Sequence, residues 1–253
     1  MDAAHIEQAA EVLFQARTSG RRIPELPRPL KPASMDEVQA IIMSVDRRIS
    51  EPLAGWKFHA KPGKELCAAP LYRSRVFTSP ARVPRAMAQS LSIEAEISFR
   101  LTRDLPPREK AYDPEEVFSS AVACAAFEVV DSRYSDLRKM VAASLYEVYA
   151  DHMANGAFVF GELRSDWRKF DFSKTRVTMM QGDKTLADQL GGHPNTQPGD
   201  ALPLFVNWMR SRGGLKAGTF VATGSFTSFR VMEAGREVIG QFEGFGEVRA
   251  VIT

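Results

Sequence analysis

The chain has 253 residues, and its 33 basic and 31 acidic residues leave a formal net charge of +2. Its hydrophobic fraction of 44% and charged fraction of 25% are near the averages of folded proteins, which argues against a disordered or a membrane-spanning chain. Because the charges are spread along the sequence, we expect neither nucleic acid nor a membrane as a partner. Two cysteines without CxxC spacing and a charged N-terminal segment are typical of a cytoplasmic protein.

The N-terminal part of the chain is predicted to be helical. Apolar residues recur at helical spacing between about residues 3 and 18. Four prolines in the segment 24–32 then exclude a helix and predict an extended connector. Ser34 and Glu37 form a capping box, which begins a second helix. These elements predict a helical N-terminal lobe at residues 1–54.

The rest of the chain, residues 55–253, is predicted to be one catalytic domain that is mainly β-structure. Its first strand is Gly55-Trp56-Lys57-Phe58. One helix is predicted to begin at Asp113-Pro114 and to continue through Cys124, and another to begin at Asp200 and end at Gly213-Gly214. Without internal repeats or strict strand-helix alternation, the pattern indicates an α+β fold. Further strands are predicted at 93–102, 126–131, 156–163, 175–180, 219–223 and 236–252.

The segment 93–101 has the pattern of a half-buried strand. Apolar and polar residues alternate there with a period of two, so Glu94 and Glu96 are predicted to point to the same face. Two like charges on one face repel unless water screens them or a cation lies between them. Hard carboxylate oxygens at this spacing suit Mg²⁺ or Mn²⁺ better than zinc. An exposed strand face with two glutamates is the ordinary alternative.

A third carboxylate is predicted in another strand. Glu128 lies in the middle of the apolar run 125–131, where burial of a lone carboxylate is costly unless it is paired or bound to metal. We therefore expect Glu128 to be a third ligand of the cation. A structural ion pair between Glu128 and Arg133 is the competing explanation.

Several motifs, in order along most of the chain, carry a resemblance to a known family. The resemblance is to the 2-keto-4-pentenoate hydratase and 4-oxalocrotonate decarboxylase family, within the fumarylacetoacetate hydrolase superfamily. It implies a twisted, roll-like mixed β-sheet with peripheral helices. The motifs are GWKFHA near residue 55, IEAEISFRLTRDLP, FEVVDSRYSD, ADHMANGAFVFG, LKAGTFVATGSFT and the closing FEGFGEVRAVI.

The resemblance also implies a metal site and a homo-oligomer. Glu94, Glu96 and Glu128 align with the family's metal-binding glutamates, and Lys57 corresponds to the lysine of its GWK or GYK motif. A Mg²⁺ or Mn²⁺ ion in this site is expected to bind the carboxylate and the adjacent 2-oxo or 2-hydroxy oxygen of a small substrate. We expect Lys57 to shuttle a proton, provided that burial near the cation lowers its pKa; the alternative is a surface lysine on a strand.

The activity that this resemblance implies is that of a hydro-lyase of aromatic catabolism. The enzyme would add water to a 2-hydroxy-2,4-dienoate to give a 4-hydroxy-2-oxo acid. Decarboxylation of a 2-oxo-3-enedioate is the alternative; both reactions start from the same metal-bound enolate, so the motifs do not separate them. Two further alternatives are hydrolysis of an acylpyruvate and a catalytically altered subunit that supports an active partner.

One loop departs from the family's usual sequence. Hydratases of this family usually read ADNASSG or ADNxSNG where this chain reads ADHMANG, at residues 150–156. Serine is missing from the middle of the motif. His152 and Asn155 are therefore the candidates that replace its hydroxyl in catalysis, unless the reaction differs. A buried histidine that only donates a structural hydrogen bond is the alternative for His152.

The remaining substrate-binding residues are predicted from two segments. Residues 66–72 lack the acid expected there in a hydratase, so Arg73 or Arg75 is a candidate for binding a second substrate carboxylate, unless it is simply solvated. Ser228 occupies a position where glycine is expected. Contacts to the first substrate carboxylate are expected from Thr223, Gly224 and Ser225.

Overall fold

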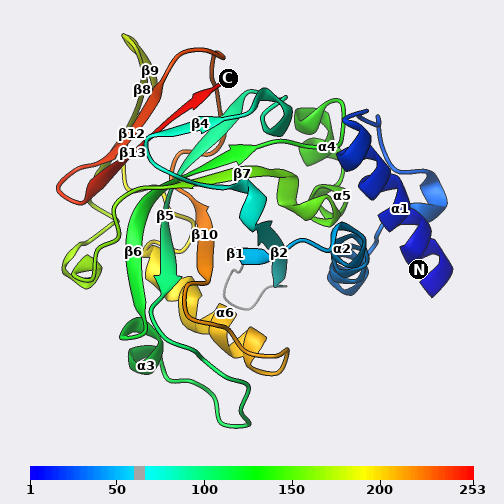
Figure 1. Cartoon of the computed structure of the whole chain (residues 1–253), viewed down its shortest axis with the longest axis horizontal. Helices are drawn as coiled ribbons and strands as arrows, with labels where there is room; N and C mark the ends of the chain where they lie inside the picture. The colour runs from blue at the N-terminus through cyan, green and yellow to red at the C-terminus, as the bar shows by residue number, and fades with distance from the viewer. Residues whose placement is uncertain (60–65) are drawn as a thin grey trace.

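The computed structural model describes residues 1–59 and 66–253, so Ala60, the last residue of the GWKFHA motif, lies outside the described residues. Two sheets form the centre of the molecule, and helices lie around them. In Figure 1 the first two helices lie at one end of the molecule and the smaller sheet lies at the other. No helix in the described part of the chain is long and apolar enough to cross a membrane.

The two N-terminal helices lie where the sequence predicts them. Helix α1 spans Ala3–Ser19 and helix α2 spans Met35–Ile49. The capping box of α2 is formed, because the Ser34 hydroxyl accepts a hydrogen bond from Glu37 N (3.3 Å). The Glu37 carboxylate in turn accepts one from Ala33 N (2.7 Å). Between the helices, the predicted extended connector is interrupted by one 3₁₀ turn, η1 (Arg28–Leu30).

An eight-stranded sheet and a five-stranded sheet contain the strands. The strands of the larger sheet are β1 Leu53–His59, β2 Cys67–Tyr72, β3 Val76–Thr78, β5 Ser92–Leu101, β6 Ala121–Val130, β7 Asn155–Phe160, β10 Phe220–Ser225 and β11 Arg230–Val231. Those of the smaller sheet are β4 Ala81–Val83, β8 Arg176–Gln181, β9 Lys184–Leu190, β12 Val238–Phe242 and β13 Gly246–Ile252.

Both sheets are mixed. The larger sheet has the order β2-β1-β10-β5-β6-β7-β3, with β11 beside β5, and the smaller has the order β4-β13-β12-β8-β9. The pairs β1–β10, β3–β7 and β4–β13 are parallel, and the other described pairs are antiparallel. This arrangement confirms the predicted mixed, twisted β-roll with peripheral helices.

The main core lies between the two sheets. Ile97 of β5 and Phe127 of β6 belong to one apolar cluster with Phe242 and Val248 of the smaller sheet. The Phe127 ring lies so close to β12 that a Cβ built at Gly240 would be 2.6 Å from it, and the close packing therefore requires glycine there. Since side chains alternate along a strand, the opposite face of β5 and β6 carries the polar residues.

Helices α1 and α2 pack on the remainder of the protein through a second apolar cluster. In this cluster Leu13 and Ile41 lie with Cys67 of β2, Tyr134 and Val148. The N-terminal helices thus share a core with the larger sheet and with helices α4 (Leu137–Ala143) and α5 (Leu145–Ala150). The division into a lobe at 1–54 and a domain at 55–253 stays a prediction.

One predicted helix is mostly wrong. Helix α3 begins at Pro114, capped by Asp113, but it ends at Phe118. The predicted continuation through Cys124 lies instead in β6, in the middle of the larger sheet. Alanine favours a helix locally, but this segment pairs with β5 along its length, and the sheet overrides the local preference. Helix α6 spans Ala201–Arg210, so it begins one residue after the predicted start at Asp200.

Candidate metal centre

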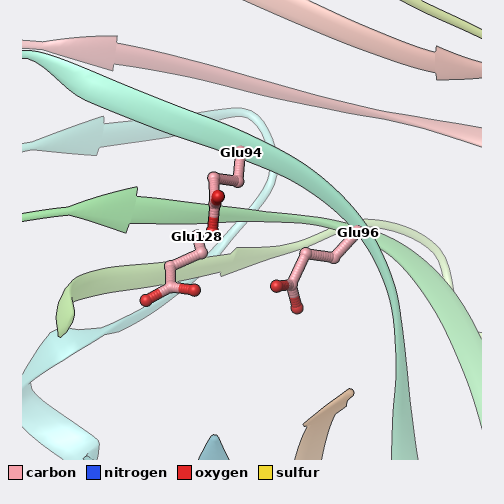
Figure 2. A group of neighbouring side chains, drawn as sticks. All are labelled: Glu94, Glu96 and Glu128. Atoms are coloured by element: carbon pink, nitrogen blue, oxygen red, sulfur yellow. The ribbon is translucent and has the colours of Figure 1, made fainter. Parts of the chain in front are cut away.

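The three predicted metal-binding glutamates lie on two neighbouring strands. Glu94 and Glu96 belong to β5, and Glu128 belongs to the antiparallel β6, whose register places it directly opposite Glu94. Glu96 is two residues along the same strand as Glu94, so it shares that face, as the alternation predicts. Figure 2 shows the three carboxylates turned toward one another.

The geometry of these carboxylates fits a divalent cation. One oxygen from each glutamate lies within 4.8 Å of the others, a separation that oxygens bound about 2.0–2.6 Å from a shared ion allow. Glu96 and Glu128 are almost completely buried. Glu96 Oε1 and Glu128 Oε2 nevertheless have no hydrogen-bond partner among the described residues. A buried carboxylate oxygen without a partner is costly, and a cation at this position would supply the missing interaction.

Burial and mutual repulsion raise the affinity of these carboxylates for protons. Burial first, and then the charge of Glu128, raise the pKa of Glu94 from 4.5 to about 7. The same two causes raise the pKa of Glu96 well above its usual value. A cation must therefore displace protons from this site at neutral pH, which makes its affinity depend on pH.

Lys57 lies on β1 and reaches the same carboxylates across the sheet. Its Nζ donates to Glu128 Oε1 (2.5 Å) and to the carbonyl oxygen of Met153 (3.0 Å). Burial lowers the pKa of Lys57, but the three glutamates outweigh burial and raise the pKa above its usual 10.5. This direction reflects the glutamates alone; the expectation that burial near a bound cation lowers the pKa of Lys57 stays a prediction. In this arrangement Lys57 is a partly buried ammonium group in contact with Glu128.

A short turn presents the Met153 carbonyl to that lysine. The φ angles of residues 152–154 are 49°, 52° and 56°, the left-handed conformation that costs a non-glycine residue roughly 1–3 kcal/mol. Arg133 holds both sides of the turn, since it donates to the carbonyl oxygens of Asp151 (2.7 Å) and Asn155 (2.9 Å). The turn is thus maintained by buried hydrogen bonds outside the carboxylate site.

A cavity of about 320 Å³ opens beside the carboxylates, at the lower end of the range for small-molecule sites. Two of the predicted contacts to the substrate carboxylate, Gly224 and Ser225, line it. The third, Thr223, is buried in the sheet with its Oγ1 3.4 Å from the carbonyl oxygen of Ile97. Ser228, found where glycine is expected, also lines the cavity and has a φ of 51°, a conformation that favours glycine.

The two predicted catalytic residues that would replace the missing serine are not brought to this cavity. His152 Nδ1 lies 3.0 Å from Arg17 Nη2, and the His152 ring contacts the ring of Tyr72. Burial first, and then the positive charges of Arg17 and Arg133, hold the pKa of His152 well below its usual value. Asn155 is buried at the start of β7. Neither residue is among the described residues that line the cavity.

The arginines that the sequence suggested also lie elsewhere. Arg73 is exposed, and Arg75 donates to the carbonyl oxygen of Gly156 (2.9 Å) on the far side of the turn. Arg133 forms a buried ion pair with Asp151. The alternative of an ion pair between Glu128 and Arg133 is therefore wrong, because the partner of Glu128 is a lysine.

Sequence reasoning missed several residues of the cavity wall. Helix α5, which it did not predict, contributes Val148 and Tyr149, and the Tyr149 ring lies 5.4 Å from the ring of His59 on β1. Met153 of the strained turn also lines the cavity. No local pattern marks these residues, since they meet only where separate segments fold together. Gly192 and Pro194, from the loop before helix α6, also line the cavity.

Sequence comparison finds relatives of known activity. The chain is 28% identical over 184 residues to a 2-keto-4-pentenoate hydratase of Burkholderia vietnamiensis, covering 72% of this chain and 68% of the relative. It is 25% identical over 256 residues to 2-keto-4-pentenoate hydratase 3 of Pseudomonas putida, covering 96% and 93% of the two chains. No family model matches the chain.

Structure comparison extends the similarity to the whole chain. The 4-oxalocrotonate decarboxylase of Pseudomonas putida G7, crystallised with calcium and acetate, matches with a TM-score of 0.80 at 19% identity. The match covers 100% of this chain and 99% of the decarboxylase. The same enzyme with magnesium and adipate gives a TM-score of 0.79 at 18% identity. These comparisons confirm the resemblance and the fold that the sequence motifs indicated.

Proposed function

The chain is related to the 2-keto-4-pentenoate hydratases and 4-oxalocrotonate decarboxylases and shares their fold, and we propose that it is a metal-dependent enzyme acting on a small 2-oxo or 2-hydroxy-dienoic acid. The reaction that we propose is the addition of water to a 2-hydroxy-2,4-dienoate, which gives a 4-hydroxy-2-oxo acid. Both sequence relatives described above are named hydratases, which supports this choice.

The buried carboxylate cluster is the observation that carries the proposal. Three carboxylates lie together, and among the described residues their one ammonium partner is Lys57, which pairs with Glu128; two of the buried carboxylate oxygens have no partner there. The excess negative charge and the oxygen ligands both match a divalent, hard cation. Crystals of the structurally similar decarboxylase contain calcium or magnesium, which supports a cation of this class. We propose Mg²⁺ or Mn²⁺ as the bound ion.

An ion held by Glu94, Glu96 and Glu128 would stabilise negative charge on the substrate's C2 oxygen as a Lewis acid and would orient its carboxylate. Lys57 lies beside the same carboxylates, and its ammonium can deliver a proton to the substrate. Ser225 of β10 pairs with Glu96 of β5, and the Ser225 hydroxyl and the backbone at Gly224 line the cavity beside the carboxylates, where they are suited to bind a substrate carboxylate. Val148 and Met153 give the cavity apolar surface, against which the carbon chain of the substrate would pack.

Decarboxylation of a 2-oxo-3-enedioate is the second candidate. The match to 4-oxalocrotonate decarboxylase along the whole chain favours it. That substrate carries a second carboxylate, for which an arginine is the usual partner. Among the described residues that line the cavity there is no arginine, and this composition supports the hydratase reaction.

Product analysis on both substrate classes tests the proposal. The purified chain, stripped of metal with a chelator, is supplied with Mg²⁺ or Mn²⁺ and either a 2-hydroxy-2,4-dienoate or a 2-oxo-3-enedioate. We expect the 4-hydroxy-2-oxo acid from the first, and neither reaction without added metal. Release of carbon dioxide from the second would favour the decarboxylase. If neither substrate reacts with either metal, the chain is not the proposed enzyme, and the alternative of an inactive partner subunit gains support.

Three variants separate metal binding from proton transfer. Glu128→Gln is expected to lose both Mn²⁺ binding and turnover, because it removes one ligand from the set. Lys57→Met is expected to keep Mn²⁺ binding while turnover falls about 10²–10⁴-fold, the range for a lost acid-base group. Glu115→Gln, at an exposed ion pair with Arg168, is the control and is expected to change neither. Full turnover by Lys57→Met with metal bound would exclude the proposed role of Lys57.

A further inference from the structure

A second polar cavity lies on the other side of the turn at 152–154. It is bounded by four arginines, Arg17, Arg22, Arg75 and Arg133, together with Asp131, and we call it the arginine cavity. Its volume of about 20 Å³ exceeds the roughly 10–15 Å³ that one bound water needs. It is far smaller than a small-molecule pocket, so only one small ligand fits.

The arginine cavity contains more positive than negative charge. Arg22 is paired with Asp131, and Arg133 is paired with Asp151. Within residues 1–59 and 66–253, neither Arg17 nor Arg75 has a carboxylate within 4.0 Å. Two guanidinium groups are therefore left without a carboxylate in direct contact, beside a space that can hold a ligand.

Arg17 provides an independent sign of a missing partner. Its Nη1 is buried and has no hydrogen-bond partner among the described residues, although its Nη2 contacts His152. Burial first, and then the charges of Arg133 and Arg75, lower the pKa of Arg17 to about 9. The group is still charged at neutral pH, so it carries a buried donor without an acceptor.

We propose that the arginine cavity binds one small monovalent anion of the halide class. A monovalent anion accepts the free Arg17 N–H and offsets one of the two positive charges, whereas a water molecule supplies only the acceptor. The exposed residues Gly20 and Gln89 lie at the rim of the cavity, so the ion can exchange with solvent.

The position of this site links it to the carboxylate centre. Arg133 and Arg75 donate to carbonyl oxygens on the two sides of the turn at 152–154. The same turn presents the Met153 carbonyl to Lys57. An anion that lowers the repulsion among the arginines therefore stabilises the turn that positions Lys57. The binding site itself does not depend on the proposed function.

The experiment compares bromide with gluconate, a large anion that does not fit the cavity. The purified, metal-free chain is unfolded by heat at equal ionic strength in potassium bromide and in potassium gluconate. We expect the Tm to be about 2–5 °C higher in bromide, the shift that a ligand present at several times its Kd produces in a chain of this length. A crystal soaked in bromide is expected to show an anomalous scattering peak beside Arg17.

Two matched variants control for general salt effects. Arg17→Gln removes the unpartnered donor and is expected to abolish the difference between bromide and gluconate. Arg21→Gln removes an exposed arginine of the same segment, which does not line the cavity, and is expected to keep the difference. The proposal is overturned if the wild-type Tm is equal in both salts, if the difference persists in Arg17→Gln, or if the bromide map is empty at the cavity. The map decides the question even if Arg17→Gln does not fold.

Discussion

Replacing Glu94 by glutamine tests the electrostatics of the carboxylate centre without requiring any substrate. Glu94 lies directly opposite Glu128, and burial together with that charge raises its pKa from 4.5 to about 7. A carboxyl whose pKa is raised in the folded state contributes its full stability below the unfolded pKa. That contribution is lost as the pH rises through the folded pKa. The metal-free protein is therefore weakened by Glu94 at and above neutral pH.

The magnitude follows from the two pKa values. A group with a pKa of 4.5 when unfolded and about 7 when folded costs the folded state about 2 kcal/mol more at pH 8 than at pH 5.5. Glutamine does not titrate, so Glu94→Gln escapes this cost. When the pH is raised from 5.5 to 8, the free energy of unfolding of the variant should therefore increase by about 2 kcal/mol relative to that of the wild type. This corresponds to about 4–8 °C in Tm.

Urea unfolding of both proteins in a chelator, at the two pH values, measures this difference. His152 and His193, whose pKa values are lowered by burial, affect both proteins equally and cancel. Adding Mn²⁺ at the higher pH should stabilise the wild type more than the variant, because the ion replaces the protons on the carboxylates. If the difference between the proteins does not change with pH, or decreases as the pH rises, the electrostatic account of this site is refuted.

Three further predictions concern the framework of the site. Arg133→Met should lower the free energy of unfolding by about 3–5 kcal/mol, because it leaves the Asp151 carboxylate buried without its ion-pair partner. Urea unfolding measures this change. Arg168→Met, which breaks an exposed ion pair, is the control and should shift the urea midpoint little. Gly55→Ala should destabilise the protein by about 1–3 kcal/mol, because its Cβ would lie 2.3 Å from a backbone oxygen of β10. Thermal unfolding measures this loss, and Gly246→Ala, whose Cβ would meet no atom within 4 Å, is the control. Removal of divalent ions by a chelator should lower the Tm at pH 8, and Mg²⁺ or Mn²⁺ should restore it.

Local sequence patterns were sufficient for the elements that depend on neighbouring residues. The helical periodicity and the capping box predicted α1 and α2, because helix formation and capping involve residues only three or four positions apart. The strict alternation along β5 likewise predicted that Glu94 and Glu96 share a face. The same reasoning failed for residues 121–124, where alanine favours a helix locally and the surrounding sheet overrode that preference.

Contacts between distant segments required the tertiary structure. Glu128 was a candidate ligand because it is an acid in an apolar run, but its position opposite Glu94 depends on the register between β5 and β6. Glu128 pairs with Lys57 and not with Arg133, and this choice depends on which segments the fold brings together. The orientation of His152 away from the cavity is set by the turn that contains it.

The sequence by itself therefore determined the helices at the N-terminus, the shared face of two glutamates and the family resemblance. The tertiary structure alone decided the third carboxylate's place, the pairing of Lys57 with Glu128 and the arginine cavity behind the turn. The physical reason is that hydrogen-bond periodicity is local, whereas burial and electrostatic repulsion depend on groups that the chain brings together from far apart.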